Sequence, residues 1–238
     1  MSPAVFSQGA VWGKLTMQKR TRRYFDSHFK ASYVMTHERA GPWQLLTLPP
    51  YDIVPKGVVA FDQIRSGTPR DLFVHFHCWD DAFERLCQFR EKDMSLIGEF
   101  RGAFPPDWSQ FTDFDFGLNL WNLRRNRIIA NCMLENGIDI LPAATWWDEA
   151  SLEHCLDGLP QHSLIEVSNV NTRGSLESKR LFNVGLRRVR DVLDPLAIIL
   201  YGSPLEEPFD GPQVLFYQNS HHTGNGCSYL NQEQLQLI

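Results

Sequence analysis

Short apolar runs alternate with longer helical stretches from about residue 58 to residue 203, and this alternation constrains the fold more than any other feature. The strand-like runs cover 58–61, 72–78, 96–100, 138–144, 164–167 and 196–200, with 214–217 as a further candidate. The helical stretches cover 82–90, 116–136, 149–156 and 177–193. Because strands joined through helices pair in parallel with right-handed crossovers, the sequence predicts an α/β domain.

The number of strands decides between two architectures for this domain. A partial or irregular TIM-like barrel is the leading expectation, and an open parallel sheet is the alternative. We expect three parts: a basic, irregular segment at 1–57 that packs on the core, a β/α core at 58–203, and a C-terminal extension and tail at 204–238.

Composition narrows the class of protein. The chain has 238 residues, 43% hydrophobic and 21% charged, which is ordinary for a globular domain. Its sequence contains no run of 18 apolar residues, so we expect no membrane span, and the first 15 residues lack the pattern of a signal peptide. The five cysteines form no CxxC pair, which favours reduced thiols in the cytoplasm over disulfides or a zinc site.

The N-terminal part of the chain is basic although the net charge is −5. Residues 1–57 contain eight basic and three acidic residues, and the densest run includes Arg20, Arg22 and Arg23. Such a run either binds the phosphates of a nucleic acid or forms a solvated surface. We therefore take DNA as a candidate partner.

Polar and aromatic residues follow the predicted strands. In parallel α/β folds the loops after the strands gather on one face, where ligands bind. We expect catalytic roles for Asp107 and Asp148, and binding roles for Asp62, Trp108, Trp147 and Tyr201. Asp80, Asp81 and Asp148 also directly precede helices, where aspartate commonly caps the N-terminus. The sequence contains no cofactor motif, and Mg²⁺ is the ion that such carboxylates would bind.

The predicted helix at 116–136 places polar residues among apolar ones. Leu118, Trp121, Ile129, Cys132 and Met133 form an apolar stripe that also contains Asn122 and Arg125, whereas Arg124 and Arg127 fall outside it. Because a bare buried charge is costly, Arg125 must be paired within the protein or bound to an anionic ligand. We retain it as a candidate catalytic residue and Asn122 as a binding residue.

Two further patterns point to ligands or partners. His75 and His77 share one face of a predicted strand and could bind a metal, although histidines satisfied within the protein are more common. The last five residues resemble the peptide by which bacterial DNA polymerases and repair proteins dock on the sliding clamp. The residues expected to make that contact are Gln234, Leu235, Leu237 and Ile238.

Taken together, several motifs resemble a family of phages and mobile elements known as domain of unknown function 4417. The matching pieces are Phe73-Val74-His75-Phe76, Trp79-Asp80-Asp81, Pro106-Asp107-Trp108-Ser109, Trp121-Asn122, Arg125-Asn126-Arg127, Leu141-Pro142, Trp147-Asp148 and Asp157-Gly158. The resemblance implies a bacterial or phage cytoplasmic setting and no particular mechanism. It also singles out Asp107, Asn122, Arg125, Asn126 and Asp148.

Two functions remain open at this point. The first is a DNA-associated accessory factor in phage replication or DNA metabolism, which the basic segment, the clamp-like tail and the resemblance favour. The second is a barrel-type enzyme that acts on a nucleotide, nucleic acid or sugar through its strand-end carboxylates. Whether the chain is an enzyme at all is left open by its sequence.

Overall fold

The computed structural model describes residues 26–27, 30–88, 91–170, 172–219, 226–231 and 234. The chain divides into two compact units, residues 1–36 and residues 37–238. The described part of the first unit includes helix α2 (Ala31–Thr36), and the second unit contains the sheets and the remaining helices named below. The boundaries that we expect after residues 57 and 203 stay predictions.

One sheet of the second unit is built around three parallel strands. Strand β3 (Gly57–Ala60) pairs in parallel with β4 (Phe73–His75), and β4 pairs in parallel with β5 (Gly102–Ala103). Strand β9 (Cys227–Tyr229) adds to the free side of β3 in the antiparallel direction. The sheet order is therefore β5-β4-β3-β9.

A second sheet contains β6 (Leu164–Ser168), β7 (Ala197–Gly202) and β8 (Val214–Gln218), all parallel. All six residues of β7 are buried, which agrees with an apolar central strand covered on both faces. Strands β1 (Arg39–Ala40) and β2 (Leu45–Leu46) form a separate hairpin.

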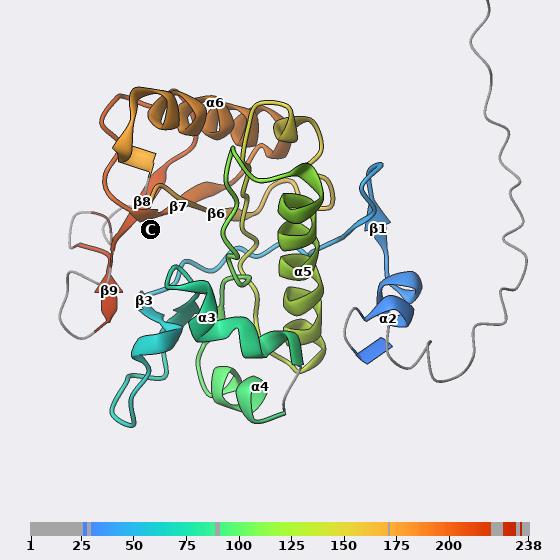
Figure 1. Ribbon diagram of the computed structural model, residues 1–238. Helices are drawn as coiled ribbons and strands as arrows, with labels where there is room; N and C mark the ends of the chain where they lie inside the picture. The colour runs from blue at the N-terminus through green and yellow to red at the C-terminus, as the bar shows by residue number, and fades with distance from the viewer. Residues whose placement is uncertain are drawn as a thin grey trace, which may run out of the picture. The chain divides into compact units, whose positions relative to one another are not determined.

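Single backbone bridges connect the two larger sheets in the same direction. Ala103 of β5 bridges to Ile140 and Ala143 bridges to Glu166 of β6, both in parallel. The carboxyl ends of β3–β8 therefore face the same edge (Figure 1). In the described residues none of the three sheets closes into a barrel, although β8 and β9 approach within 8 Å between Cα atoms. An open α/β sheet fits, whereas the expected TIM-like barrel is not shown.

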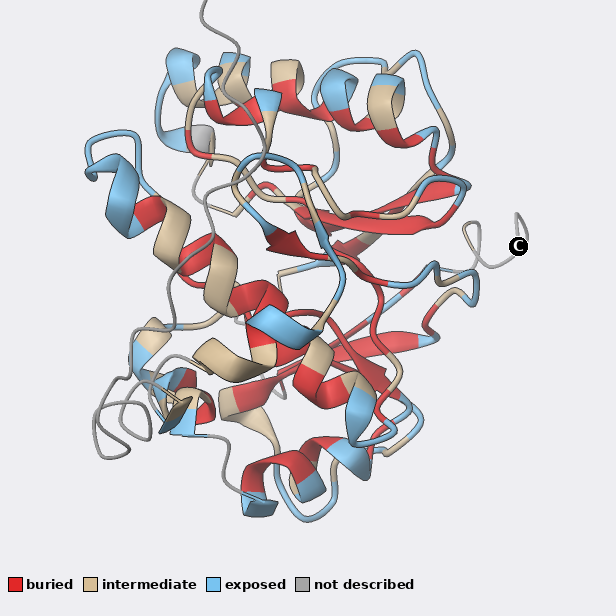
Figure 2. Ribbon diagram, turned by 90° about the vertical axis from the view of Figure 1, so that its right-hand side faces the viewer, coloured by how far each residue is buried: buried red, intermediate tan, exposed pale blue. Residues whose placement is uncertain are grey.

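The helices and short 3₁₀ segments cover these sheets (Figure 1). They are η1 (Phe61–Gln63), α3 (Asp80–Phe83), η2 (Glu84–Gln88), α4 (Glu91–Gly98), α5 (Phe116–Glu135), η3 (Ser151–Glu153), η4 (Thr172–Gly174) and α6 (Leu176–Leu193). Figure 2 shows that the strands are largely buried, while α5 and α6 are buried on one side. No helix in the described ranges is long and apolar enough to cross a membrane.

The starts and ends of the long helices follow from local chemistry. The Asp115 side chain accepts a hydrogen bond from the backbone N–H of Leu118 and so caps the first turn of α5. At its other end, Gly137 adopts a positive φ of 75° that favours glycine. The Ser175 side chain caps α6 in the same manner, by accepting from the N–H of Ser178.

Three expectations for local structure are corrected. Residues 96–100 are not a strand: Met94 and Ile97 are buried on one side of α4, a helical spacing, and the strand begins at Gly102 instead. The expected helix at 149–156 is only the short η3. The segment 138–144 contributes isolated bridges at Ile140 and Ala143 rather than a regular strand.

Candidate functional site

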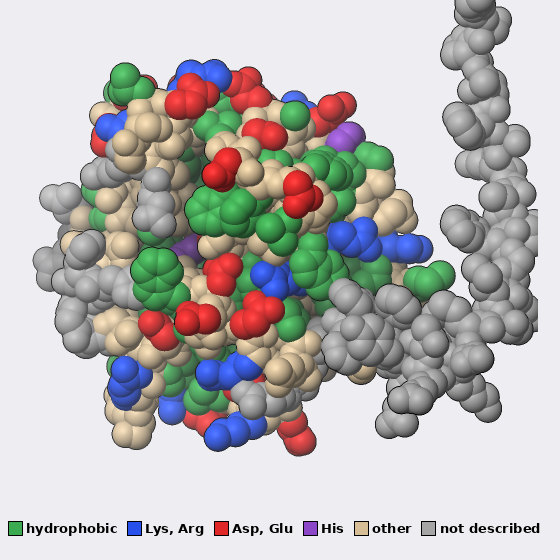
Figure 3. Space-filling model, in the orientation of Figure 1, with side chains coloured by type: hydrophobic (Ala, Val, Ile, Leu, Met, Phe, Trp, Pro, Cys, Tyr) green, Lys and Arg blue, Asp and Glu red, His purple; other side chains and the backbone are tan. Residues whose placement is uncertain are grey.

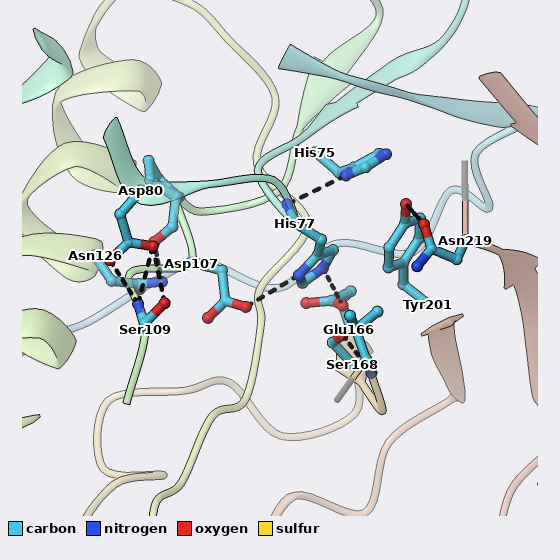
Figure 4. A network of polar contacts seen from close by, with 12 residues as sticks. His75, His77, Asp80, Asp107, Ser109, Asn126, Glu166, Ser168, Tyr201 and Asn219 are labelled. Carbon is cyan, nitrogen blue, oxygen red and sulfur yellow. Dashed lines mark hydrogen bonds and ion pairs between the residues drawn. The ribbon is translucent and has the colours of Figure 1, made fainter. Parts of the chain in front are cut away.

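A buried histidine lies between two carboxylates at the carboxyl edge of the parallel strands (Figure 4). His77 follows the end of β4, and its Nδ1 lies 3.0 Å from Oδ2 of Asp107, which follows β5. Its Nε2 lies 2.9 Å from Oε1 of Glu166 on β6. The Asp107 side chain is 28% exposed, whereas those of His77 and Glu166 are 4% and 2% exposed. The three groups thus form a hydrogen-bonded chain that runs from the surface into the core.

An aromatic residue on a strand of the second sheet covers the histidine ring. The ring of Tyr201 on β7 stacks on His77 with centroids 4.6 Å apart and an interplanar angle of 16°. The ring centroids of His75 and Tyr201 are 4.3 Å apart, and His75 Nδ1 accepts a hydrogen bond from the backbone N–H of His77. Such stacking favours an imidazolium, because the face of an aromatic ring attracts a cation.

The surroundings favour the charged form of His77. Burial lowers the pKa of the imidazole, but the charge of Glu166 and hydrogen bonds to Asp107 and Glu166 outweigh burial and raise it to about 10. Burial raises the pKa of Glu166, and His77 opposes that rise. At neutral pH we therefore assign an imidazolium, which donates a hydrogen bond through Nδ1 to Asp107 and through Nε2 to Glu166.

Further carboxylates surround this chain of groups. Burial raises the pKa of Asp80, and the charge of Asp107 contributes to the rise. Burial raises the pKa of the Cys78 thiol to about 12, and the charge of Asp62 makes a smaller contribution. The thiol thus stays protonated and is a poor nucleophile. Figure 3 shows Asp and Glu side chains gathered near the middle of this face, beside apolar side chains and a partly visible histidine.

The loop that contains Asp107 is fixed by side chains on both sides. Asn126 Nδ2 donates to the Pro106 carbonyl over 2.8 Å, and Asn122 Nδ2 donates to the Ser109 carbonyl over 2.6 Å. Asp80 accepts from both the backbone N–H and the hydroxyl of Ser109. We expect Asp80 to cap the following helix, but its helix begins after Trp79 with no side-chain cap, and Asp80 bonds to this loop instead.

Trp108 anchors the same loop in the core. The indole is 1% exposed, and its Nε1 donates to Glu84 Oε2 over 2.8 Å. Arg125 donates to both oxygens of Glu84, and its guanidinium lies 4.3 Å from the centre of the Trp108 ring. Of the two arrangements that we expect for Arg125, the structure has the first: its charge is paired within the protein, by Glu84.

Several predicted residues lie beside the His77 cluster, and others do not join it. Asp107 and Tyr201 contact His77 directly, while Asn122, Asn126, Arg125 and Trp108 secure the Asp107 loop. Asp62 accepts a bond from Gln63 through Oδ2, and its buried Oδ1 has no partner among the described residues. Asp148 instead accepts from the N–H of Ser151, and Trp147 stacks on Trp43.

The assignment of buried residues on α5 needs two corrections. Arg127, which we place outside the apolar stripe, is fully buried, and its Nη2 donates to the Cys155 carbonyl over 3.3 Å. Leu118, which we place within the stripe, is 41% exposed. The apolar stripe does not predict the buried side of α5 correctly, because that side is partly polar. Its buried polar residues include Asn119, Asn122 and Asn126.

Some predicted contact residues fall outside the described residues: Arg20, Arg22, Arg23, Leu235, Leu237 and Ile238. Gln234 is described, and its backbone N–H donates to Asn231 Oδ1 over 2.8 Å. In the described part of the chain, no group of three or more His, Cys, Asp or Glu residues is placed to hold a metal ion.

From the sequence we expect no role for Glu166, and for His77 either metal binding or, more commonly, bonds within the protein. One signal for Glu166 is present in the sequence: it is a charged residue flanked by the apolar Leu164, Ile165 and Val167, and buried carboxylates require a partner. That partner, His77, lies 89 positions away in the chain. It can be identified only once the parallel order of β4, β5 and β6 is known.

Comparison with known proteins finds a matching family and two curated relatives. The family model described as "Domain of unknown function (DUF4417)" matches residues 37–218. Among curated proteins, the "Gene 1 protein" of Mycobacterium phage L5 is 28% identical over 187 residues, covering 77% of this chain and 82% of the relative. The "Gene 1 protein" of Mycobacterium phage D29 is 26% identical over 171 residues, covering 71% of this chain and 63% of the relative. No solved structure matches.

Proposed function

This chain belongs to the family described as "Domain of unknown function (DUF4417)", and from that premise we propose that it is an acid–base enzyme acting through Asp107, His77 and Glu166. The observation that carries the proposal is the hydrogen-bonded chain of these three side chains, from a part-exposed carboxylate to a fully buried one. Perturbed titratable groups at the carboxyl edge of parallel strands are typical of catalytic sites.

Each group has a separate role in this proposal. Asp107 is the residue that meets the substrate, because it alone of the three is substantially exposed and its second oxygen is turned away from His77 (Figure 4). It accepts a proton from a substrate hydroxyl or a water molecule and returns that proton to the product. The His77 imidazolium holds the Asp107 carboxylate in place through the hydrogen bond from Nδ1. Glu166 orients the ring and balances its charge, as a carboxylate does for a catalytic histidine.

Carboxylates outnumber the His77 cation near Asp107, and this excess of negative charge favours an uncharged reacting group. Asp62, Asp80 and Asp81 all act on the Cys78 thiol beside the site, and Glu84 already neutralises Arg125. A phosphate placed at Asp107 would be repelled by these carboxylates. Of the substrates considered for a strand-end enzyme, we therefore favour a sugar or the sugar part of a nucleoside over a nucleotide.

Turnover of a substrate panel by the Asp107→Asn variant tests this function. The panel consists of glycosides, nucleosides, nucleotides and nucleic acid. We expect the wild-type protein to act on a glycoside or nucleoside, and the variant to lose about 10²–10⁴-fold in rate, because the amide cannot accept the proton. Asp113→Asn, at an exposed aspartate in the segment before α5, is the matched control and should keep wild-type rates. Absence of turnover of the whole panel by the wild-type protein, or equal rates in Asp107→Asn, contradicts the proposal.

A second candidate function is association with DNA, with the sliding clamp as a further partner. Two features of the sequence support it, the basic run with Arg20, Arg22 and Arg23 and the C-terminal Gln234, Leu235, Leu237 and Ile238. The phage relatives agree with such a setting. We expect a gel shift with duplex DNA at low salt that weakens steeply as salt rises and disappears when the three arginines become alanine. Equal binding by that triple variant would exclude the arginines as the contact.

A further inference from the structure

We propose that Asn122 and Asn126 of α5 are positioning residues. They set the place of Asp107 against His77 through hydrogen bonds to the backbone on either side of Asp107. This inference deepens the proposed function, since it concerns the same site. It does not depend on turnover, because the placement of Asp107 can be measured in the resting protein.

The two asparagines act on the residues that bracket Asp107. Asn126 holds the carbonyl of Pro106, one residue before Asp107, and Asn122 holds the carbonyl of Ser109, two residues after it. Their positions differ by four, so both side chains lie on one side of the helix. One turn earlier, Asn119 binds both the N–H and the carbonyl of Phe111. Side chains of one 20-residue helix thereby hold the loop at Pro106, Ser109 and Phe111.

The amides are poorly explained as general stabilisers of the core. Asn122 and Asn126 are 4% and 3% exposed, and the Oδ1 atom of each has no hydrogen-bond partner among the described residues. A buried acceptor without a partner is costly, and an apolar side chain of the same size would exchange that cost for a backbone carbonyl without its donor. What an apolar residue cannot do is fix the two carbonyls, which is the contribution that we assign to these amides.

Asn131 offers a matched comparison on the same helix. Its Nδ2 donates to the Thr47 carbonyl over 3.1 Å and to the Arg127 carbonyl over 2.9 Å. It therefore has the same residue type and the same kind of bond, and it is directed to a loop that does not contain Asp107. Replacing Asn131 removes a comparable interaction while leaving the 106–111 loop untouched.

The test is an NMR titration of the His77 imidazole in Asn122→Leu, Asn126→Leu and Asn131→Leu, each alone and combined with Asp107→Asn. Displacement of Asp107 removes a hydrogen bond and a nearby charge from His77, so we expect its pKa to fall by about 1–2 units in the first two variants. We expect no shift in Asn131→Leu, and no additional shift from Asn122→Leu or Asn126→Leu once Asp107 is asparagine. The serine variants Asn122→Ser and Asn126→Ser are judged by the same criterion if a leucine variant does not fold.

An unchanged pKa of His77 in the Asn122 and Asn126 variants would overturn the inference. So would an equal shift in Asn131→Leu, since that result would show a general loosening of the core. The expected pattern in a protein that turns over no substrate of the panel would leave the positioning role standing and reject the proposed enzyme.

Discussion

Among the described residues, His77 and Arg127 are two cations with buried side chains whose pKa values are shifted in opposite directions, and the contrast supports His77 as the centre of the proposed site. The ring of His77 stacks on Tyr201 and is bonded to two carboxylates, Glu166 and Asp107, which raise its pKa to about 10. Arg127 donates to the Cys155 carbonyl, and burial lowers its pKa to about 10, with the charges of Cys155 and Asp157 opposing the fall. Only the histidine combines a stabilised charge with a carboxylate that reaches solvent.

A residue of the candidate site could be predicted from sequence only where helix capping did not already explain it. Asp107 stands several residues before the next helix, so capping does not account for it, and it does contact His77. Asp148 precedes η3 and behaves as a local rule predicts, by bonding to Ser151. Glu166 and His77 could not be paired from sequence, because their contact depends on which strands are neighbours.

At the scale of helices and strands, length decided what could be predicted. The helix expected at 116–136 is α5, and the one expected at 177–193 is α6, since each shows several turns of regular spacing. The run at 96–100 is too short to distinguish a strand from the end of a helix by its apolar residues alone. Strand β9 was missed because its pairing with β3 is made across most of the chain.

The contact between α6 and Trp146 gives a prediction at this scale. A Cβ atom at Gly185 of α6 would lie 2.0 Å from Cε2 of the Trp146 indole, whose Nε1 donates to the Leu181 carbonyl of the same helix. Alanine normally favours a helix over glycine by about 0.5–1 kcal/mol. We expect the clash to outweigh this gain, so that Gly185→Ala lowers the free energy of unfolding by about 1–3 kcal/mol in urea denaturation.

Gly98 provides the control for that measurement. It lies in α4, and the nearest atom to an added Cβ there is Ile138 Cγ1 at 3.7 Å, an ordinary contact. Gly98→Ala should change the free energy of unfolding by no more than about 1 kcal/mol in either direction. If Gly185→Ala were as stable as the wild-type protein, the close packing of α6 on Trp146 would be disproved.

At the scale of the whole second unit, the direction of the strands determines where chemistry can occur. β3–β8 all run parallel within their sheets, and the bridges at Ile140 and Ala143 extend the same direction across the gap between the sheets. Residues that follow different strands therefore meet at one edge, as the alternation in the sequence predicts. The sequence could not decide how far the sheet closes, because closure depends on long-range strand contacts.

A ¹⁵N NMR titration of the histidines between pH 5 and pH 11 tests the central claim most directly. The account predicts that at pH 7 both ring nitrogens of His77 are protonated and hydrogen-bonded, with a pKa near 10. Replacement of its buried partner in Glu166→Gln should lower that pKa by at least about one unit. A neutral His77 at pH 7 with a pKa near 6.5, unchanged by Glu166→Gln, would contradict the account.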